Sequence, residues 1–112
     1  MKKNEFVKSL NVSRETLKSF YEYEALLSKW NEKINLVSKN TLVDIWERHF
    51  LDSGQIIKHV EVSGKRWVDV GSGAGFPGLV VALLLRDRKI DCDLVLVEKN
   101  PKKGFFLSEV IR

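Results

Sequence analysis

Hydrophobic residues in the first part of the chain recur at the spacing of an amphipathic helix. Ser13 is suited to cap a helix N-terminus, and apolar side chains then follow at steps of three and four positions: Phe20, Tyr23, Leu27, Trp30 and Ile34. The opposite face of such a helix is charged. The pattern predicts one long helix with a single buried stripe.

A second helix is expected to begin at Thr41, because Thr41 and Asp44 have the spacing of a capping box. Its buried side would be formed by Leu42, Ile45 and Trp46. The segment is expected to run or bend onward to Val60, and the polar residues 63–65 then indicate a turn. Residues 1–66 are therefore interpreted as a helical N-terminal region.

The pattern changes after residue 66. Residues 67–70 form a short segment with two β-branched valines, and Gly71 follows directly. This pattern predicts a buried strand. Residues 79–85 are apolar on nearly every side and follow Pro77, which suits the first turn of a helix. Residues 94–97 form a second apolar segment of the kind found in parallel sheets.

Asn100 and Pro101 indicate the start of another helix, with Asn100 as its cap and Pro101 at its first position. A strand, a helix and a second strand in this order predict a right-handed βαβ unit. Residues 67–112 are therefore expected to form an α/β region.

Composition narrows the class of protein. The chain has 112 residues, 44% of them hydrophobic, which is enough for one soluble domain with a core. A single cysteine excludes an internal disulfide and favours a reducing compartment. The basic start lacks the apolar run of a secretory signal, and the longest apolar run is too short to cross a bilayer. A cytoplasmic protein without a membrane partner is expected.

The glycine-rich run over 69–78 carries the candidate chemistry, because it lies between a predicted strand and a predicted helix. Glycines permit positive φ and let a ligand approach the backbone, and free N–H groups at a helix start favour a negative group. Glu98 ends the second predicted strand, where a carboxylate can accept hydrogen bonds from ribose hydroxyls. A nucleotide-like ligand is therefore predicted.

Three ligand classes compete for this loop. No Lys-Ser or Lys-Thr pair follows the glycines, so the run lacks the pattern of a phosphate-binding P-loop. The residues from Gly73 to Gly78 satisfy the G-x-G-x-x-G pattern of dinucleotide sites. The alternating glycines of 71–75 after Asp69 favour S-adenosylmethionine. An NAD-binding oxidoreductase fragment and a non-catalytic RNA-binding fragment remain as alternatives, and a net charge of +4 permits an RNA partner without requiring one.

Three segments together are specific enough to suggest a family. They are Leu-Ser-Lys-Trp-Asn-Glu-Lys-Ile-Asn-Leu at 27–36, Arg-His-Phe-Leu-Asp-Ser at 48–53 and the glycine run at 69–78. In this order they resemble the RsmG (GidB) family of bacterial ribosomal RNA methyltransferases. The resemblance implies transfer of a methyl group from S-adenosyl-L-methionine to N7 of a guanosine in 16S ribosomal RNA. It also implies the small ribosomal subunit rather than DNA as partner. The oligomeric state stays open, with a monomer expected for the full-length protein.

By this resemblance six residues belong to the cofactor site: Asp69, Gly71, Gly73, Gly75, Phe76 and Glu98. Gly71 and Phe76 would line the pocket, and Glu98 would take the ribose position. Asp69 would order the loop. The family strand often ends in Asp-Ser, whereas here Lys99 follows the acidic residue. No catalytic residue is assigned and no metal ligand is expected.

The resemblance also implies a Rossmann-like methyltransferase fold that this chain only begins. Family members run to about 200 residues with roughly seven strands, whereas two strands are predicted here. The expected structure is a helical part followed by the first βαβα unit, with an incomplete sheet and an exposed apolar edge. A fragment without full activity, or without micromolar affinity for the cofactor, is the resulting expectation.

Several side chains near these motifs have more than one interpretation. His49 could hydrogen-bond within the 48–53 block and brace the loop, or could be an ordinary half-buried imidazole. Trp30 and Trp46 are expected to pack in the core, and Asn35 is expected to turn the chain after the long helix. A solvated polar face, rather than phosphate contacts, is the expected role of Lys99, Lys102 and Lys103.

Overall fold

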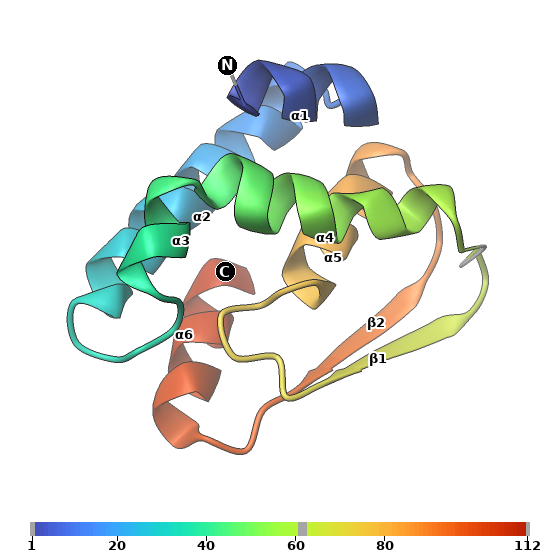
Figure 1. Cartoon of the computed structure of the whole chain (residues 1–112). Coiled ribbons are helices and arrows are strands. Elements are labelled where there is room, and N and C mark those ends of the chain that lie inside the picture. The colour runs from blue at the N-terminus through green and yellow to red at the C-terminus, as the bar shows by residue number, and fades with distance from the viewer. Residues whose placement is uncertain (1, 61–62, 112) are drawn as a thin grey trace.

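The computed structural model describes residues 2–60 and 63–111. In chain order the elements are α1 (Lys2–Leu10), α2 (Arg14–Asn31), α3 (Lys39–Val43), the π-helix η1 (Trp46–Leu51), α4 (Asp52–Gly54), the 3-10 helix η2 (Gln55–Lys58), β1 (Arg66–Val70), α5 (Gly78–Asp87), β2 (Asp93–Val97) and α6 (Pro101–Ile111). Figure 1 shows the two strands at one side of the molecule and the helices gathered on the other. Within the described part of the chain, no helix combines the length and hydropathy needed to cross a bilayer.

Helix α2 confirms the long helix that the apolar periodicity predicts. The Ser13 side chain caps it by accepting a hydrogen bond from the Thr16 N–H at 3.2 Å. The stripe faces inward, and Phe20, Tyr23 and Leu27 are fully buried. Hydrophobic periodicity therefore located this helix because burial of the stripe stabilises it.

The chain leaves α2 at Asn31, three residues before the apolar pattern ends. The side-chain oxygen of Asn31 accepts hydrogen bonds from the N–H groups of Leu36 and Val37, at 2.9 and 3.1 Å. These bonds close the turn that was expected to depend on Asn35, which is exposed. A side chain in the last helical turn thus holds the bend.

The second helical segment starts earlier than predicted. Ser38 is the cap of α3, and its hydroxyl accepts the N–H of Thr41 at 3.2 Å. The expectation that Thr41 and Asp44 form the capping box is wrong, because Thr41 is the third helical residue and Asp44 already ends α3. The chain then continues through η1, α4 and η2 to Lys58, as the expected bent helical path.

Strands β1 and β2 are parallel neighbours, with Val68 opposite Val95 and Val70 opposite Val97. Helix α5 connects them, so the predicted βαβ unit is present. Helix α6 begins as expected, because the Asn100 side chain accepts the Lys102 N–H at 2.9 Å. The architecture is mixed α/β with a two-stranded parallel sheet, which is compatible with part of a methyltransferase fold.

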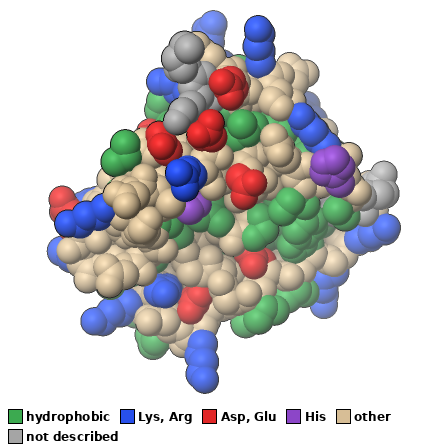
Figure 2. Space-filling model, viewed as in Figure 1, with side chains coloured by type: hydrophobic (Ala, Val, Ile, Leu, Met, Phe, Trp, Pro, Cys, Tyr) green, Lys and Arg blue, Asp and Glu red, His purple; other side chains and the backbone are tan. Residues whose placement is uncertain are grey.

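The prediction that the first strand is buried is wrong for one of its faces. Val81 and Leu85 of α5 pack against one face of the sheet, on Trp67 and Leu94. The opposite face carries exposed valines, and Val70 is 76% exposed. Figure 2 shows hydrophobic side chains at the surface where Figure 1 draws the strands. Successive side chains of a strand point to opposite faces of the sheet, so a helix on one face leaves every second side chain exposed to solvent.

One cluster of buried side chains joins the helical region to the α/β region. Its members come from both: Phe6, Phe20, Tyr23, Leu27, Phe50, Leu79, Val80, Leu84 and Phe106. Trp46 packs at its edge, with its ring centroid 4.9 Å from that of Phe50. The helical region therefore shares a core with the elements that carry the glycine loop.

Polar contacts at the end of α5 strengthen this connection. The guanidinium of Arg88 donates to the Leu10 carbonyl at 2.6 Å. Asp87 accepts hydrogen bonds from the Ser13 hydroxyl and from the Thr16 hydroxyl, the latter at 2.7 Å. Burial opposes the ionisation of Asp87, but these hydrogen bonds outweigh it and lower its pKa. These contacts attach the C-terminal end of α5 to the end of α1 and the start of α2.

Candidate glycine-loop site

The loop between β1 and α5 has the backbone shape that its glycines predict. Gly71, Gly73 and Gly75 have φ values of 75°, 53° and 96°, in the region that L side chains rarely adopt. The loop stays attached to the second strand, because the N–H groups of Gly71 and Ser72 donate to the Val97 carbonyl at 2.8 and 3.1 Å. A residue without a Cβ is therefore favoured at each of these three positions.

Glu98 meets the loop directly. One carboxylate oxygen accepts the Gly73 N–H at 2.6 Å, and the other accepts the Asn100 N–H at 3.0 Å. These backbone donors, Asn100 first and Gly73 second, lower the pKa of Glu98 and keep it ionised. The structure therefore brings together the two features that the sequence placed at the ends of neighbouring parallel strands.

Asp69 lies under the loop and connects β1 to α5. It is buried, and its carboxylate accepts the N–H of Gly78, the first residue of α5, at 3.0 Å. A Cβ on Gly78 would lie 2.6 Å from that carboxylate and 2.3 Å from the Leu96 side chain. Asp69 thus holds the strand and the helix start in close contact.

The helix start is consequently less available to an anion than expected. Asp69 occupies the N–H of Gly78, and the N–H of Leu79 donates to the Gly75 carbonyl at 2.8 Å. Free N–H groups at the start of α5 were expected to bind a negatively charged ligand group. For the N–H groups of Gly78 and Leu79 this expectation is wrong, because both already have partners. The open part of the site is the loop itself, since a Cβ on Gly71 would meet nothing within 4 Å.

The Phe76 ring packs against three rings of the helical region, those of His49, Tyr23 and Phe50. The His49 ring stacks on it at 4.4 Å between centroids with an interplanar angle of 7°, and the Tyr23 ring lies 5.8 Å away at 27°. The Tyr23 hydroxyl also donates to the Ala74 carbonyl at 2.5 Å. A Cβ on Gly75 would lie 2.5 Å from that hydroxyl. Tyr23 on α2 and His49 on η1 therefore hold the loop in place through these contacts.

His49 braces the loop through its ring. Its Nε2 is buried and has no hydrogen-bond partner within the described part of the chain. Burial lowers the pKa of His49; the negative charge of Asp52 acts in the opposite direction, and Arg48 adds to the lowering. The partly buried imidazole thus supports Phe76 by ring stacking, whereas its Nε2 does not make the hydrogen bond expected within the 48–53 block.

Sequence reasoning missed the contact of Tyr23 with the loop, because it treated this residue only as part of the apolar stripe. The available signal was its hydroxyl. Tyr23 is 1% exposed, and a buried phenol normally finds a hydrogen-bond partner. The pattern could indicate that a partner was needed but not that the partner was Ala74.

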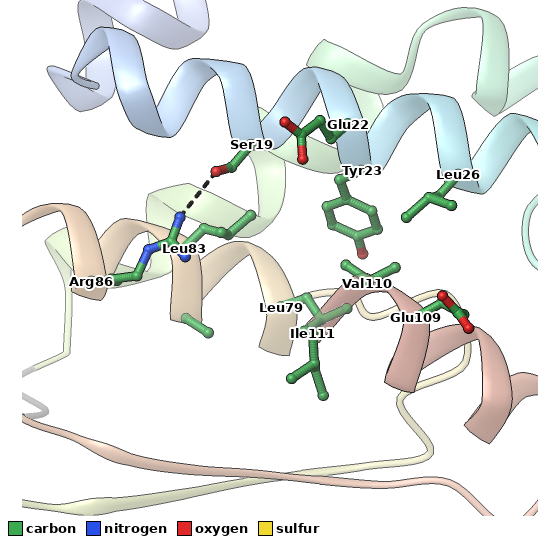
Figure 3. Close-up of a pocket in the computed structure, with 11 residues that line it drawn as sticks. Ser19, Glu22, Tyr23, Leu26, Leu79, Leu83, Arg86, Glu109, Val110 and Ile111 are labelled. Atoms are coloured by element: carbon green, nitrogen blue, oxygen red, sulfur yellow. Dashed lines mark hydrogen bonds between the residues drawn. The ribbon is translucent and has the colours of Figure 1, made fainter.

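A separate hollow of about 270 Å³ is lined by side chains of α2, α5 and α6, with Tyr23 among them. Figure 3 shows Tyr23 and Leu26 extending from α2 toward Val110, with Arg86 donating to Ser19 at 3.0 Å. None of the six predicted cofactor residues lines this hollow.

The chemistry available at the loop is that of a carboxylate and open backbone groups. Glu98 can accept hydrogen bonds, and Gly71 is exposed. Among residues 2–60 and 63–111, no group of three or more His, Cys, Asp or Glu side chains is placed to hold a metal ion. Such a site can recognise hydroxyls and positive charge.

Comparison with known proteins gives one consistent result. A family model described as rRNA small subunit methyltransferase G (GidB) matches residues 16–112. The protein named ribosomal RNA small subunit methyltransferase G from Parvibaculum lavamentivorans is 53% identical over 102 residues, which are 91% of this chain and 45% of that protein. Proteins of the same name from Rhodospirillum centenum and Cereibacter sphaeroides are 48% and 43% identical, over 96% and 92% of this chain and 48% and 50% of their own length.

The chain therefore spans about half the length of the curated relatives that it matches. The matched region includes the 27–36 segment, the 48–53 block and the glycine loop. The resemblance read from these motifs is confirmed. The chain belongs to the rRNA small subunit methyltransferase G (GidB) family.

Proposed function

We propose that the glycine loop and Glu98 form the donor side of a methyl-transfer site that binds S-adenosylmethionine. In this proposal the protein serves the methylation of N7 of a guanosine in 16S ribosomal RNA of the small subunit. Family membership supports a methyltransferase acting on ribosomal RNA. The cofactor, the acceptor atom and the six site residues are part of the proposal.

The observation that carries the choice of cofactor is the contact between Asp69 and Gly78. In dinucleotide-binding folds the pyrophosphate sits on the N-terminus of the helix after the glycine loop. Here that N–H is occupied by a carboxylate at 3.0 Å, which would repel a phosphate. S-adenosylmethionine has no phosphate and carries positive charge, so it suits this loop better than NAD does.

Glu98 has the capacity to bind ribose without releasing the loop. A carboxylate offers about four acceptor sites on its two oxygens, and the structure uses one bond on each oxygen, to Gly73 and to Asn100. Two ribose hydroxyls could therefore donate to the remaining lone pairs. The two backbone bonds would hold the carboxylate in place for them.

The proposed reaction does not require a side chain that acts as a general acid or base. S-adenosylmethionine, when bound, supplies an electrophilic methyl group, and N7 of guanine has a lone pair and no proton to remove. The protein would therefore contribute alignment and exclusion of water rather than a general base. Asp69 already bonds to Gly78 beneath the loop, and Asp52 is exposed on α4, so neither is assigned a catalytic role.

An amide-resolved NMR titration tests the cofactor. Addition of S-adenosylmethionine at millimolar concentration is expected to shift the amide signals of Gly71, Gly73 and the residues next to Glu98, with a smaller effect from NAD. Glu98→Gln should weaken this response, while Glu22→Gln, an exposed position on α2, should not. Shifts confined to other regions, or a stronger response to NAD, would refute the cofactor assignment.

The acceptor is tested separately. Small ribosomal subunits lacking the modification are incubated with the protein and methyl-labelled S-adenosylmethionine. Label at guanine N7 is recognised by chain cleavage after borohydride and aniline treatment. Label at another atom, or label only in the large subunit, would contradict the proposed reaction.

A further inference from the structure

A groove between the end of α2 and the start of α6 is left unexplained by the cofactor site. It has a volume of about 310 Å³ and is lined by Trp30, Lys33, Ile34, Lys102 and Phe105. Its walls are hydrophobic, whereas the two lysines are exposed at its rim. The side chain of Phe105 is 68% exposed.

The exposure of Phe105 is not a consequence of core packing. Its neighbour Phe106 is fully buried, and the ring centroids of Phe106 and Trp30 are 5.9 Å apart. Phe105, one position earlier on α6, is exposed. Trp30 is only half-buried, because its other side lines the groove. Two aromatic side chains therefore offer surface to a ligand at this place.

The two chain segments that contribute to the groove are rich in lysine, and Lys33 and Lys102 line it. Residues 29–39 and 99–103 together carry six lysines and one acidic residue, Glu32. Their charge surplus exceeds the net charge of the whole chain, which is +4. The remaining residues together have a formal charge of −1, so these two segments account for the positive net charge of the chain.

The groove adjoins the glycine-loop site. Asn100 donates its N–H to Glu98 at 3.0 Å, and its side chain accepts the Lys102 N–H at 2.9 Å. Lys103 is close enough to Glu98 to affect its pKa. In Figure 1 a short loop joins the end of β2 to the start of α6. A ligand in the groove would lie next to the proposed donor site.

We propose that this groove binds a single-stranded segment of the RNA substrate next to the target nucleotide. Bases would stack on Phe105 and Trp30, and Lys33 and Lys102 would pair with phosphates, because aromatic faces and cationic side chains are the usual partners of single-stranded RNA. The lysine rim favours a polyanion over the apolar helix of a partner protein. This inference rests on the proposed function, of which it specifies the acceptor side.

Fluorescence anisotropy with a labelled single-stranded RNA oligonucleotide and the whole chain tests the proposal. Phe105→Ala is expected to weaken binding about fivefold or more, as for other base-stacking side chains. The double variant Lys33→Gln/Lys102→Gln should reduce the slope of log affinity against log salt by roughly 1.4, since each phosphate contact on a single strand contributes about 0.7.

The matched control is Lys8→Gln/Lys18→Gln, which removes the same charge from exposed positions on α1 and the first half of α2. On α2, Lys18 precedes the groove residue Trp30 by 12 positions, a rise of about 18 Å. This control should leave the salt slope unchanged. Circular dichroism should show unaltered folding, because the substituted side chains are exposed.

Absence of RNA binding, an unchanged affinity of Phe105→Ala, or an equal slope change in the control would each overturn the inference. The NMR response to S-adenosylmethionine, measured on the same variants, separates it from the proposed function. If the groove variants bind RNA normally while the cofactor response persists, only the groove assignment fails. If RNA binding depends on the groove but no cofactor response occurs, the groove stands and the donor site fails.

Discussion

The hydroxyl of Tyr23, on α2, donates a hydrogen bond to the carbonyl oxygen of Ala74, in the middle of the glycine loop. The phenol is almost completely buried, and burial, with a further contribution from the charge of Asp69, raises the pKa of Tyr23 well above its ordinary value. It therefore remains a neutral donor. This bond links the helical region to the backbone that is proposed to contact the cofactor.

Removing the Tyr23 hydroxyl tests that link. Tyr23→Phe keeps the ring but leaves the Ala74 carbonyl without its partner, which should cost about 1–3 kcal/mol of unfolding free energy. Urea denaturation measures the loss. Tyr21→Phe, at a position that is 40% exposed, is the control and should change stability by less than about 0.5 kcal/mol. Equal effects at the two positions would contradict a specific role for the hydroxyl.

Two glycine substitutions separate backbone strain from steric overlap. Both Gly71 and Gly75 have positive φ, so alanine at either should cost about 1 kcal/mol or more. Only at Gly75 would the new Cβ also lie 2.5 Å from Leu79 and from the Tyr23 hydroxyl, which should add about 1–3 kcal/mol. Chemical denaturation of Gly71→Ala and Gly75→Ala compares them. A larger loss at Gly71 would show that the loop packs differently.

Stability should depend on the protonation of His49. Because burial lowers the pKa of the folded-state imidazole, the unfolded chain binds the proton more tightly. Folding is therefore favoured above about pH 6.5, the value for an unperturbed histidine, and this stabilisation is lost as the pH falls through the lower folded-state pKa. His49→Phe, which retains a ring against Phe76, should flatten the decrease between neutral and mildly acidic pH.

Unfolding free energies at several pH values check this expectation. His59→Phe, at an exposed position, provides the matched substitution and should leave the decrease in place. If His49→Phe retained the full pH dependence, the stacked imidazole would not be its source.

Glu98 should stabilise the loop only while it is ionised. Its two backbone partners lower the pKa of the folded-state carboxyl below the ordinary value of 4.5. The contribution is therefore present above about pH 4.5 and is lost as the pH falls through the folded-state pKa. Amide hydrogen exchange of Gly73 and Asn100 measures it. Exchange should be faster in Glu98→Gln than in the parent at pH 6, and unchanged rates would indicate that the carboxylate does not hold these groups.

The sequence determined much of this architecture because local pattern encodes local structure. The stripe after Ser13 predicted α2, and the apolar segments after residue 66 predicted β1, α5 and β2. It also indicated that Glu98 would meet the glycine loop, because the carboxyl ends of adjacent parallel strands share one edge. The observed bond from Gly73 to Glu98 follows from that rule.

The sequence was less informative about helix starts and strand burial, because the same residues are compatible with more than one arrangement. Ser38 and Thr41 can both cap a helix, and only the folded chain selects Ser38. Likewise, the apolar residues of β1 indicate a strand but not how many of its faces are covered. In the structure Asp69 is buried whereas Val70 is not, because α5 lies on one side of the sheet.

Tertiary structure alone decided which polar and aromatic groups meet at the loop. Tyr23 and Ala74 are 51 positions apart, and Thr16 and Asp87 are 71 apart. The stacking of His49 on Phe76 likewise joins two separate segments. Periodicity specifies which face of an element is apolar, but the partner of a buried hydroxyl or ring depends on how distant segments pack, and that information is not local.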